Sequence, residues 1–291
     1  MKLGVIDVGS NAMRVLIADI TQVNGRKNLA KIAYLRLPVR LGEDVFEVGR
    51  ISDEKVEKLI QGLHTFQAVL NFYNVSIYRA VATSAMRDSE NAKKILQRIK
   101  KEVKMNLEVI TGKEEAEFVY LNFELMPQMV GDFLLIDVGG GSTEITLFCQ
   151  NEVHIARSFQ IGTVRYLKGK VEESEIQDMK NWIQSEVLIH HPQKIFGTGG
   201  NISSVHKILD LHDMESVKLR QMNQLKSDLL LLSIEERIFK YKIKQDRADV
   251  IVPAIEIYSS IIEQLGVEEI FVPKMGLSDG VLLDLYNQIK V

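Results

Sequence analysis

Apolar and polar positions in the first half of the chain predict three strands followed by alternating helices and strands. β-Branched and aromatic runs predict the strands, and Asn24-Gly25 predicts a tight hairpin turn between the second and the third. The expected strands are residues 2–7, 13–19, 27–39, 77–82 and 107–110. Apolar residues that recur on one helical face, with Ser52 as the first N-cap, predict helices at 52–73, 91–103 and from 114 onward.

The second half of the chain repeats this order. Its predicted strands are residues 133–137, 143–149, 153–160, 194–196 and 270–272. Its predicted helices are residues 172–188, 202–209, 247–265 and a terminal helix that follows Gly280, with residues 212–246 also helical and Pro253 interrupting the third helix. We expect an α/β protein of two similar domains. Residues 1–125 form the first, onto which the helix at 280–291 is expected to return, and residues 126–279 form the second.

Each half carries a glycine-containing loop between its first two strands. The loops read Asp137-Val138-Gly139-Gly140-Gly141-Ser142-Thr143-Glu144 and Ile6-Asp7-Val8-Gly9-Ser10-Asn11. Glycines let backbone N–H groups approach a phosphate closely, and the flanking carboxylates are the ligand type that Mg²⁺ takes. The pattern predicts phosphate binding with Mg²⁺ as cofactor. An ordinary glycine-rich hairpin turn is the alternative.

Composition is that of an ordinary globular protein. Of 291 residues, 46% are hydrophobic and 26% charged, and the formal net charge is −3. Because there is no general positive field, any phosphate affinity must be local, and neither nucleic acid nor a membrane is an expected partner. The single cysteine, Cys149, cannot form an internal disulfide. With no leader pattern and no apolar run near the roughly 20 residues that span a bilayer, we expect a cytoplasmic protein.

Several segments together resemble the exopolyphosphatase/guanosine pentaphosphate phosphohydrolase (Ppx/GppA) family. Besides the two loops, these are Ala82-Thr83-Ser84-Ala85-Met86-Arg87, Ile110-Thr111-Gly112-Lys113-Glu114-Glu115-Ala116, Gly197-Thr198-Gly199-Gly200, Arg247-Ala248-Asp249 and Gly276-Leu277-Ser278-Asp279-Gly280. Two positions depart from the family pattern: Asn201 replaces the usual Thr, and Ser278 replaces the usual Arg. The resemblance implies two actin-like (ribonuclease H-like) domains with the active site in the cleft between them.

The resemblance also implies an activity: Mg²⁺-dependent release of terminal phosphate from polyphosphate, from guanosine penta- or tetraphosphate, or from both. The family's catalytic glutamate corresponds to Glu115, which would activate water, and Glu144 is the second catalytic candidate. The candidate metal ligands are Asp7, Asp137 and Glu144. The candidate phosphate ligands are Gly9, Ser10, Asn11, Arg87, Gly139, Gly140, Gly141, Ser142, Thr143, Gly199 and Gly200, the last two at a predicted helix start.

Simpler roles stay open for single residues. Asp137 could stabilise its turn, Glu144 could be an exposed strand residue, and Arg87 could form a surface ion pair. Glutamates at a helix start commonly complement the helix dipole, which we expect of Glu114 and which is the alternative for Glu115.

Two other functions also stay open on this fold: a sugar- or acetate-type kinase, and a non-catalytic nucleotide- or alarmone-binding or actin-like assembly protein. A homodimer is an open option. Longer family members carry further helical domains where the resemblance ends, so we expect a preference for short polyphosphates or the pppGpp tail and distributive release.

Overall fold

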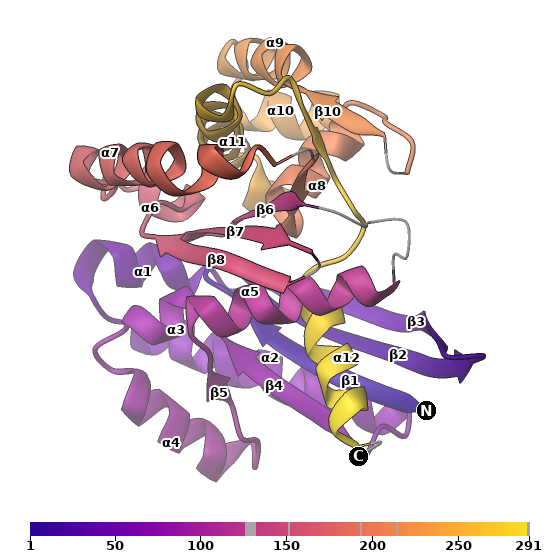
Figure 1. Ribbon diagram of the computed structural model, residues 1–291. Coiled ribbons are helices and arrows are strands. Elements are labelled where there is room, and N and C mark those ends of the chain that lie inside the picture. Colours follow the sequence, from indigo (N-terminus) through magenta and orange to yellow (C-terminus); the bar gives the residue numbers. More distant parts are fainter. Residues whose placement is uncertain (126–131, 151, 193, 214, 290–291) are drawn as a thin grey trace. The chain divides into compact units, whose positions relative to one another are not determined.

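The computed structural model describes residues 1–125, 132–150, 152–192, 194–213 and 215–289. The chain divides into two compact units, residues 1–129 with 275–291 and residues 130–274, and each contains one sheet (Figure 1). The predicted domain boundary at residues 125–126 and the last two residues of the predicted helix at 280–291 fall at or outside the described residues. The mixed α/β class with two sheets agrees with the sequence prediction.

The first unit contains a five-stranded sheet of order β3-β2-β1-β4-β5. Its strands are β1 (Lys2–Val8), β2 (Ala12–Val23), β3 (Arg26–Pro38), β4 (Tyr78–Ala82) and β5 (Glu108–Val109). The first three form an antiparallel meander, and β4 and β5 add in parallel. Asn24 and Gly25 both have positive φ, 52° and 77°, as the predicted two-residue hairpin requires.

Helices cover both faces of this sheet. They are α1 (Leu41–Val48), α2 (Asp53–Phe72), α3 (Ser84–Asp88), α4 (Ala92–Glu102), α5 (Gly112–Leu121) and α12 (Leu277–Ile289), with a 3₁₀ turn at Asn122–Leu125. Helices α5 and α12 share one apolar cluster with β1 and β2. Gly280 permits their close packing, because a Cβ there would lie 1.6 Å from the carbonyl oxygen of Phe118 in α5. On the other face, α2 contacts Met13 of β2 through Gly62.

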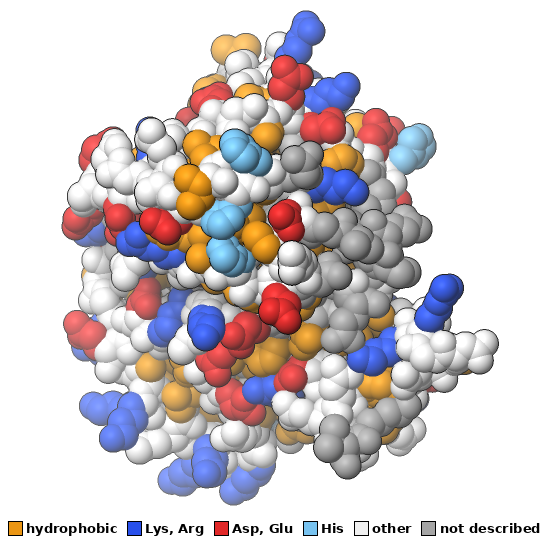
Figure 2. Space-filling model, viewed as in Figure 1, with side chains coloured by type: hydrophobic (Ala, Val, Ile, Leu, Met, Phe, Trp, Pro, Cys, Tyr) orange, Lys and Arg blue, Asp and Glu red, His pale blue; other side chains and the backbone are white. Residues whose placement is uncertain are grey.

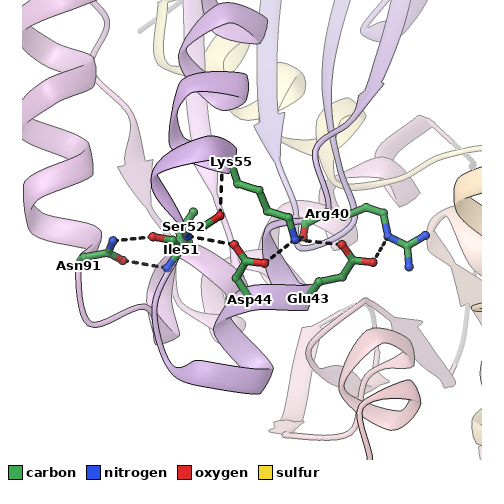
Figure 3. Close-up of polar contacts among 7 residues, drawn as sticks. All are labelled: Arg40, Glu43, Asp44, Ile51, Ser52, Lys55 and Asn91. Atoms are coloured by element: carbon green, nitrogen blue, oxygen red, sulfur yellow. Dashed lines mark hydrogen bonds and ion pairs between the residues drawn. The ribbon is translucent and has the colours of Figure 1, made fainter.

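A polar network fixes the start of α1, which the sequence analysis did not predict (Figure 3). The ammonium group of Lys55 donates to the Arg40 carbonyl (2.8 Å), to Glu43 (2.9 Å) and to Asp44 (2.7 Å). Ser52 caps α2 as predicted, and its own amide donates to Asp44. Burial opposes ionisation of Asp44, but the hydrogen bonds from Lys55 and Ser52 outweigh it and lower the pKa of that carboxyl.

The second unit contains a six-stranded sheet of order β10-β11-β9-β6-β7-β8. Its strands are β6 (Phe133–Val138), β7 (Thr143–Cys149), β8 (Glu152–Phe159), β9 (Lys194–Thr198), β10 (Ser216–Lys218) and β11 (Glu269–Phe271). As in the first unit, an antiparallel meander comes first, and β9 adds in parallel to the first strand of that meander.

The helices of the second unit pack around the central helix α11, most of whose side chains are buried. The helical elements are α6 (Thr163–Leu167), α7 (Glu173–Trp182), a π-turn (Ile183–Val187), 3₁₀ turns at Leu188–His190 and Gln245–Arg247, α8 (Gly199–Ile208), α9 (Leu219–Leu230), α10 (Ile234–Tyr241) and α11 (Ile251–Leu265).

Two sequence predictions for this unit were wrong, and a third was right only in part. Pro253 does not interrupt a helix: it is the third residue of α11, where an amide would have no partner within the helix. Residues 212–246 are not wholly helical, because they include β10. The helix expected at 172–188 gives way after Trp182 to π and 3₁₀ turns.

Acidic and basic residues nearly balance in the sequence, with 39 Asp and Glu against 36 Lys and Arg. On the face drawn in Figure 2, acidic and basic side chains are interspersed, which agrees with the net charge of −3. Within the described residues, every helix is too short or too polar to cross a bilayer.

Candidate functional site

The glycine loop of the second unit is a tight β6–β7 hairpin. The carbonyl groups of its three glycines accept hydrogen bonds from residues 163–165. The amide of Gly139 donates to the Ser142 carbonyl (2.9 Å) and closes the turn. The carbonyl of Gly139 accepts from the Thr163 amide (3.0 Å), and that of Gly140 accepts from the amides of Val164 (2.8 Å) and Arg165 (3.1 Å).

The third carbonyl of this loop, that of Gly141, accepts a hydrogen bond from Nε of Arg165 (2.9 Å). In contrast, the amides of Gly140, Gly141 and Ser142 donate no hydrogen bond to any residue that the structure describes. Thr143 is fully buried and its hydroxyl donates to the Ile161 carbonyl, so this side chain secures the segment before α6. A phosphate-binding role for Thr143 stays a prediction.

Two carboxylates flank the loop as register partners on neighbouring strands, Asp137 on β6 and Glu144 on β7. Side chains of such partners lie on the same face of the sheet. Asp137 accepts from the Thr198 hydroxyl (3.0 Å), and Glu144, only 5% exposed, accepts from the Ser158 hydroxyl (2.8 Å). The exposed-strand alternative for Glu144 was therefore wrong.

The turn from β9 into α8 meets the same loop. Gly199 is the first residue of α8, has a φ of +86° and leaves no room for a side chain, because a Cβ would lie 2.5 Å from Oδ1 of Asp137. The guanidinium group of Arg247 lies against Gly200, where a Cβ would be 2.2 Å from Nη2, and Nη1 donates to Ser204. The first turn of α8 thus adjoins one carboxylate and one cation.

A buried tyrosine of α11 joins the ends of β6 and β9. The hydroxyl of Tyr258 donates to the Thr198 carbonyl (2.9 Å) and accepts from the Val138 amide (3.2 Å). Burial, together with the negative charges of Asp137 and Glu144, raises the pKa of this phenol well above its ordinary value. Asn201 adds a second tie, because its side-chain amide donates to the Val138 carbonyl (2.8 Å).

The carbonyl groups of the glycine turn in the first unit also accept hydrogen bonds from a neighbouring segment. Gly9 closes the turn by donating to the Ala12 carbonyl (3.1 Å). The carbonyls of Ser10 and Asn11 accept from the amides of Gly42 (2.8 Å) and Arg40 (2.9 Å). The Ser10 hydroxyl shares a hydrogen bond with that of Ser84 (2.7 Å), at the start of α3.

Asp7, the third predicted metal ligand, lies in an ion pair. Its Oδ2 accepts from Nη1 of Arg14 (2.8 Å) and from the Ser278 hydroxyl (3.3 Å), and the residue is 4% exposed. Ser278, one of the two departures from the family pattern, therefore makes a polar contact with this carboxylate. Arg14 neutralises Asp7 locally, which gives Asp7 a structural role whether or not it also binds metal.

The two glutamates at the start of α5 have different surroundings. Glu114 forms a capping box with Thr111, and the hydrogen bonds from the Thr111 amide and hydroxyl lower the pKa of its carboxyl. The helix-start role predicted for Glu114 is confirmed. Glu115 is half-buried in the next position. Nη1 of Arg87 donates to the Ile110 carbonyl (3.0 Å), just before this helix. Nε of Arg87 lies 3.9 Å from Oδ1 of Asp88.

The donor set fits Mg²⁺ as a partner of phosphate. Among the described residues, no group of three or more acidic, histidine or cysteine side chains forms a metal-binding cluster. Mg²⁺ in phosphate-processing sites usually takes one or two carboxylates, several waters and substrate oxygens. The Asp137–Glu144 pair beside the glycine loop offers that number of carboxylates.

Sequence reasoning missed three contributors to this site: the segment 162–165, Arg247 and Tyr258. Arg247 was part of a recognised motif but received no role. Tyr258 carried a weak signal, because a tyrosine within an apolar helix needs a hydrogen-bond partner for its hydroxyl. The position of Gly162 was also a sequence signal, because Gly162 follows the third strand of the second half much as Gly42 follows the third strand of the first half.

The fold is that of the actin-like phosphotransferases, and similarity to known proteins narrows the class. The sequence pattern of the Ppx/GppA phosphatase family matches residues 16–289, and the chain belongs to that family. It aligns over its whole length with 99% of the crystal structure of the Aquifex aeolicus Ppx/GppA family member, with a TM-score of 0.79 and 27% identity.

Two curated relatives are each 28% identical to the chain. One is the bifunctional 3-dehydroquinate synthase/phosphatase of Fusobacterium nucleatum, which matches 96% of this chain and 46% of its own length. The other is exopolyphosphatase 1 of Mycobacterium bovis, which matches 64% of this chain and 55% of its own length. The chain thus spans about half the length of these relatives.

Proposed function

We propose that this protein is a Mg²⁺-dependent phosphohydrolase that releases the terminal phosphate of inorganic polyphosphate, with pppGpp as a second substrate of the same chemistry. The observation that carries the proposal is the Gly139–Ser142 loop, whose carbonyls are bound from behind while three consecutive amides have no partner among the described residues. Family membership supports the reaction type, and the exopolyphosphatase relative supports the substrate class.

The loop and the start of α8 would hold the terminal phosphoryl group. The amides of Gly140, Gly141 and Ser142 supply donors for phosphate oxygens, and the first turn of α8 supplies a favourable dipole with Arg247 beside it. Hydrolysis of a phosphoanhydride depends mostly on such positioning and charge neutralisation. The arrangement therefore suits a terminal phosphate better than a neutral group.

Glu115 is the proposed general base. Its carboxylate would take a proton from water as the water oxygen bonds to the terminal phosphorus, while the bridging P–O bond breaks and its electrons stay on the shortened chain. Glu114 is not equivalent, because its carboxylate is committed to the capping box.

Asp137 and Glu144 are the proposed Mg²⁺ ligands. A bound Mg²⁺ would neutralise charge on the phosphate oxygens. The carboxylates themselves are held in place by the Thr198 and Ser158 hydroxyls. Glu144 thus keeps its proposed catalytic role by holding the metal.

Phosphate release from polyphosphate, pppGpp and ATP, measured side by side with and without Mg²⁺, tests the function. We expect Mg²⁺-dependent release from polyphosphate, slower or comparable release from pppGpp and little from ATP. Phosphate release from ATP alone would contradict the proposed substrate, and phosphate transfer from ATP to an added sugar or acetate would indicate a kinase. Gel analysis of product lengths adds the chain-length test: distributive release leaves intermediate lengths, whereas disappearance of a long chain without them indicates processive release.

A further inference from the structure

We propose that the segment Gly162–Arg165 positions the phosphate-binding loop, with Arg165 and Gly162 acting as positioning residues that turn the amides of Gly140, Gly141 and Ser142 toward the substrate. The inference rests on the proposed function, because it assigns these amides to phosphate. The segment itself need not touch substrate. It acts through the carbonyls of Gly139, Gly140 and Gly141.

Peptide geometry gives the reason. In a planar trans peptide, the C=O of one residue and the N–H of the next point in opposite directions. Each of the three glycine carbonyls is bound by residues 163–165, so each following amide must point away from that segment. Three consecutive amides then face the same side, which is the geometry of an anion-binding backbone concavity.

The same device occurs in the first unit. There the third strand, β3, also leads into a short helix, and the residues at its start donate to the carbonyls of the Gly9 turn: Gly42 to Ser10 and Arg40 to Asn11. The start of that helix is itself held by the Lys55 network (Figure 3). In both units, residues that follow the third strand thus donate hydrogen bonds to the carbonyl groups of the glycine turn, although the local sequences differ.

Gly162 is required by space and not by its backbone conformation. Its φ of −137° and ψ of 159° suit any residue, yet a Cβ would lie 2.4 Å from the backbone of Gly141. A methyl group at this position must therefore push the loop away from the segment. Arg165 contributes both its amide and its Nε, and the Nε contact is the one of these four that a side-chain substitution removes.

The test uses the full chain labelled with ¹⁵N-glycine and titrated with tripolyphosphate. In wild type the Gly140 and Gly141 amide signals should shift as tripolyphosphate binds. In Arg165→Met both signals should already differ before ligand is added, and affinity should fall about tenfold, as for a weakened hydrogen bond to a charged group. Gly162→Ala should also weaken substrate binding, seen as a higher KM for polyphosphate.

Two control variants separate positioning from general damage. Arg157→Met removes a guanidinium that pairs with Asp178 elsewhere in the same unit and should change neither signal nor affinity. Gly169→Ala strains a backbone with φ of +63° but has open space around it, so it should lower thermal stability without affecting tripolyphosphate binding.

Wild-type affinity and unchanged Gly140 and Gly141 signals in Arg165→Met would overturn the inference, as would a wild type in which tripolyphosphate leaves both signals in place. If Gly162→Ala does not fold, Arg165→Met decides alone. If wild type binds tripolyphosphate through these amides and Arg165→Met binds it more weakly as expected, but wild type releases no phosphate from polyphosphate, the positioning stands and the proposed hydrolase function fails.

Discussion

Asp137 on β6 and Glu144 on β7 lie directly opposite each other, one residue pair before the glycine turn. Like charges in directly opposed positions destabilise a sheet. Asp137 accepts a hydrogen bond from the Thr198 hydroxyl, and Glu144 accepts a hydrogen bond from the Ser158 hydroxyl. A bound divalent cation would convert this repulsion into a favourable interaction, which is a further reason to propose the pair as metal ligands.

Neutralising either member of the pair should therefore separate metal binding from fold stability. Without Mg²⁺, Asp137→Asn and Glu144→Gln should melt at or above the wild-type temperature. With Mg²⁺ at 100 times its Kd, wild type should gain about 2.7 kcal/mol, and both variants should gain much less. Thermal melts across a Mg²⁺ titration measure this, with Asp178→Asn as an exposed control in the same unit. Wild-type Mg²⁺ responses in both variants would remove the pair from metal binding.

The adjacent glutamates of α5 provide a matched pair for testing the base. Glu115→Gln should lower kcat by about 10²–10⁴-fold, because the amide keeps the shape of the side chain but accepts no proton. Glu114→Gln should keep most of the activity and instead weaken the capping box with Thr111. Steady-state kinetics with equilibrium binding of polyphosphate distinguish the two. Comparable activity of the two variants would show that Glu115 is not the base.

Tyr258→Phe should lower the unfolding free energy by removing the hydroxyl that links the ends of β6 and β9. Loss of the hydroxyl leaves the Val138 amide and the Thr198 carbonyl without that partner, at an expected cost of about 1–3 kcal/mol in unfolding free energy. Tyr34→Phe, on an exposed edge-strand residue, should cost little. Denaturant unfolding of the two variants at neutral pH makes the comparison.

The raised pKa of Tyr258 adds a pH dependence to this prediction. Because the folded-state pKa lies above that of the unfolded chain, its contribution is complete below the unfolded value, near 10, and is lost as pH rises further toward the folded pKa. The stability of wild type should therefore fall more steeply above pH 10 than that of Tyr258→Phe. Parallel slopes would show that the phenol is not the group responsible.

Acid should weaken the network at the start of α1. Hydrogen bonds from Lys55 and Ser52 lower the folded-state pKa of Asp44 below its model-peptide value of 3.8 despite burial. The unfolded chain then binds the proton more tightly, so this stabilisation is present above pH 4 and is lost as pH falls through the folded pKa. Asp44→Asn should be less stable than wild type at pH 7 and should approach wild type near pH 3. A constant difference between those pH values would contradict this.

Local sequence determined much of the fold, and tertiary contact determined what the sequence could not predict. The β1–β2–β3 meander, the Ser52 cap and the place of Glu114 at a helix start follow from short-range patterns, and all are present. Strand β10 was missed because three residues become a strand only by pairing with β11. Pro253 was misjudged because its effect depends on where α11 begins.

The candidate site divides in the same way. Asp137, the glycines and Glu144 could be grouped from sequence because one hairpin joins them. The approach of Arg247 to Gly200, the bridge made by Tyr258 and the contact of Gly162 with the loop all join segments distant in the chain. Nothing in the local pattern of either partner specifies such a contact, so these contacts emerged only from the structure.

Hydrolysis of polyphosphate in H₂¹⁸O shows whether water attacks the terminal phosphorus. If water attacks the terminal phosphorus, each released phosphate carries one ¹⁸O, and the shortened chain carries none. We predict this labelling for wild type with Mg²⁺, at a rate about 10²–10⁴-fold above that of Glu115→Gln. Absence of phosphate release from polyphosphate, or release of phosphate without ¹⁸O, would contradict the account.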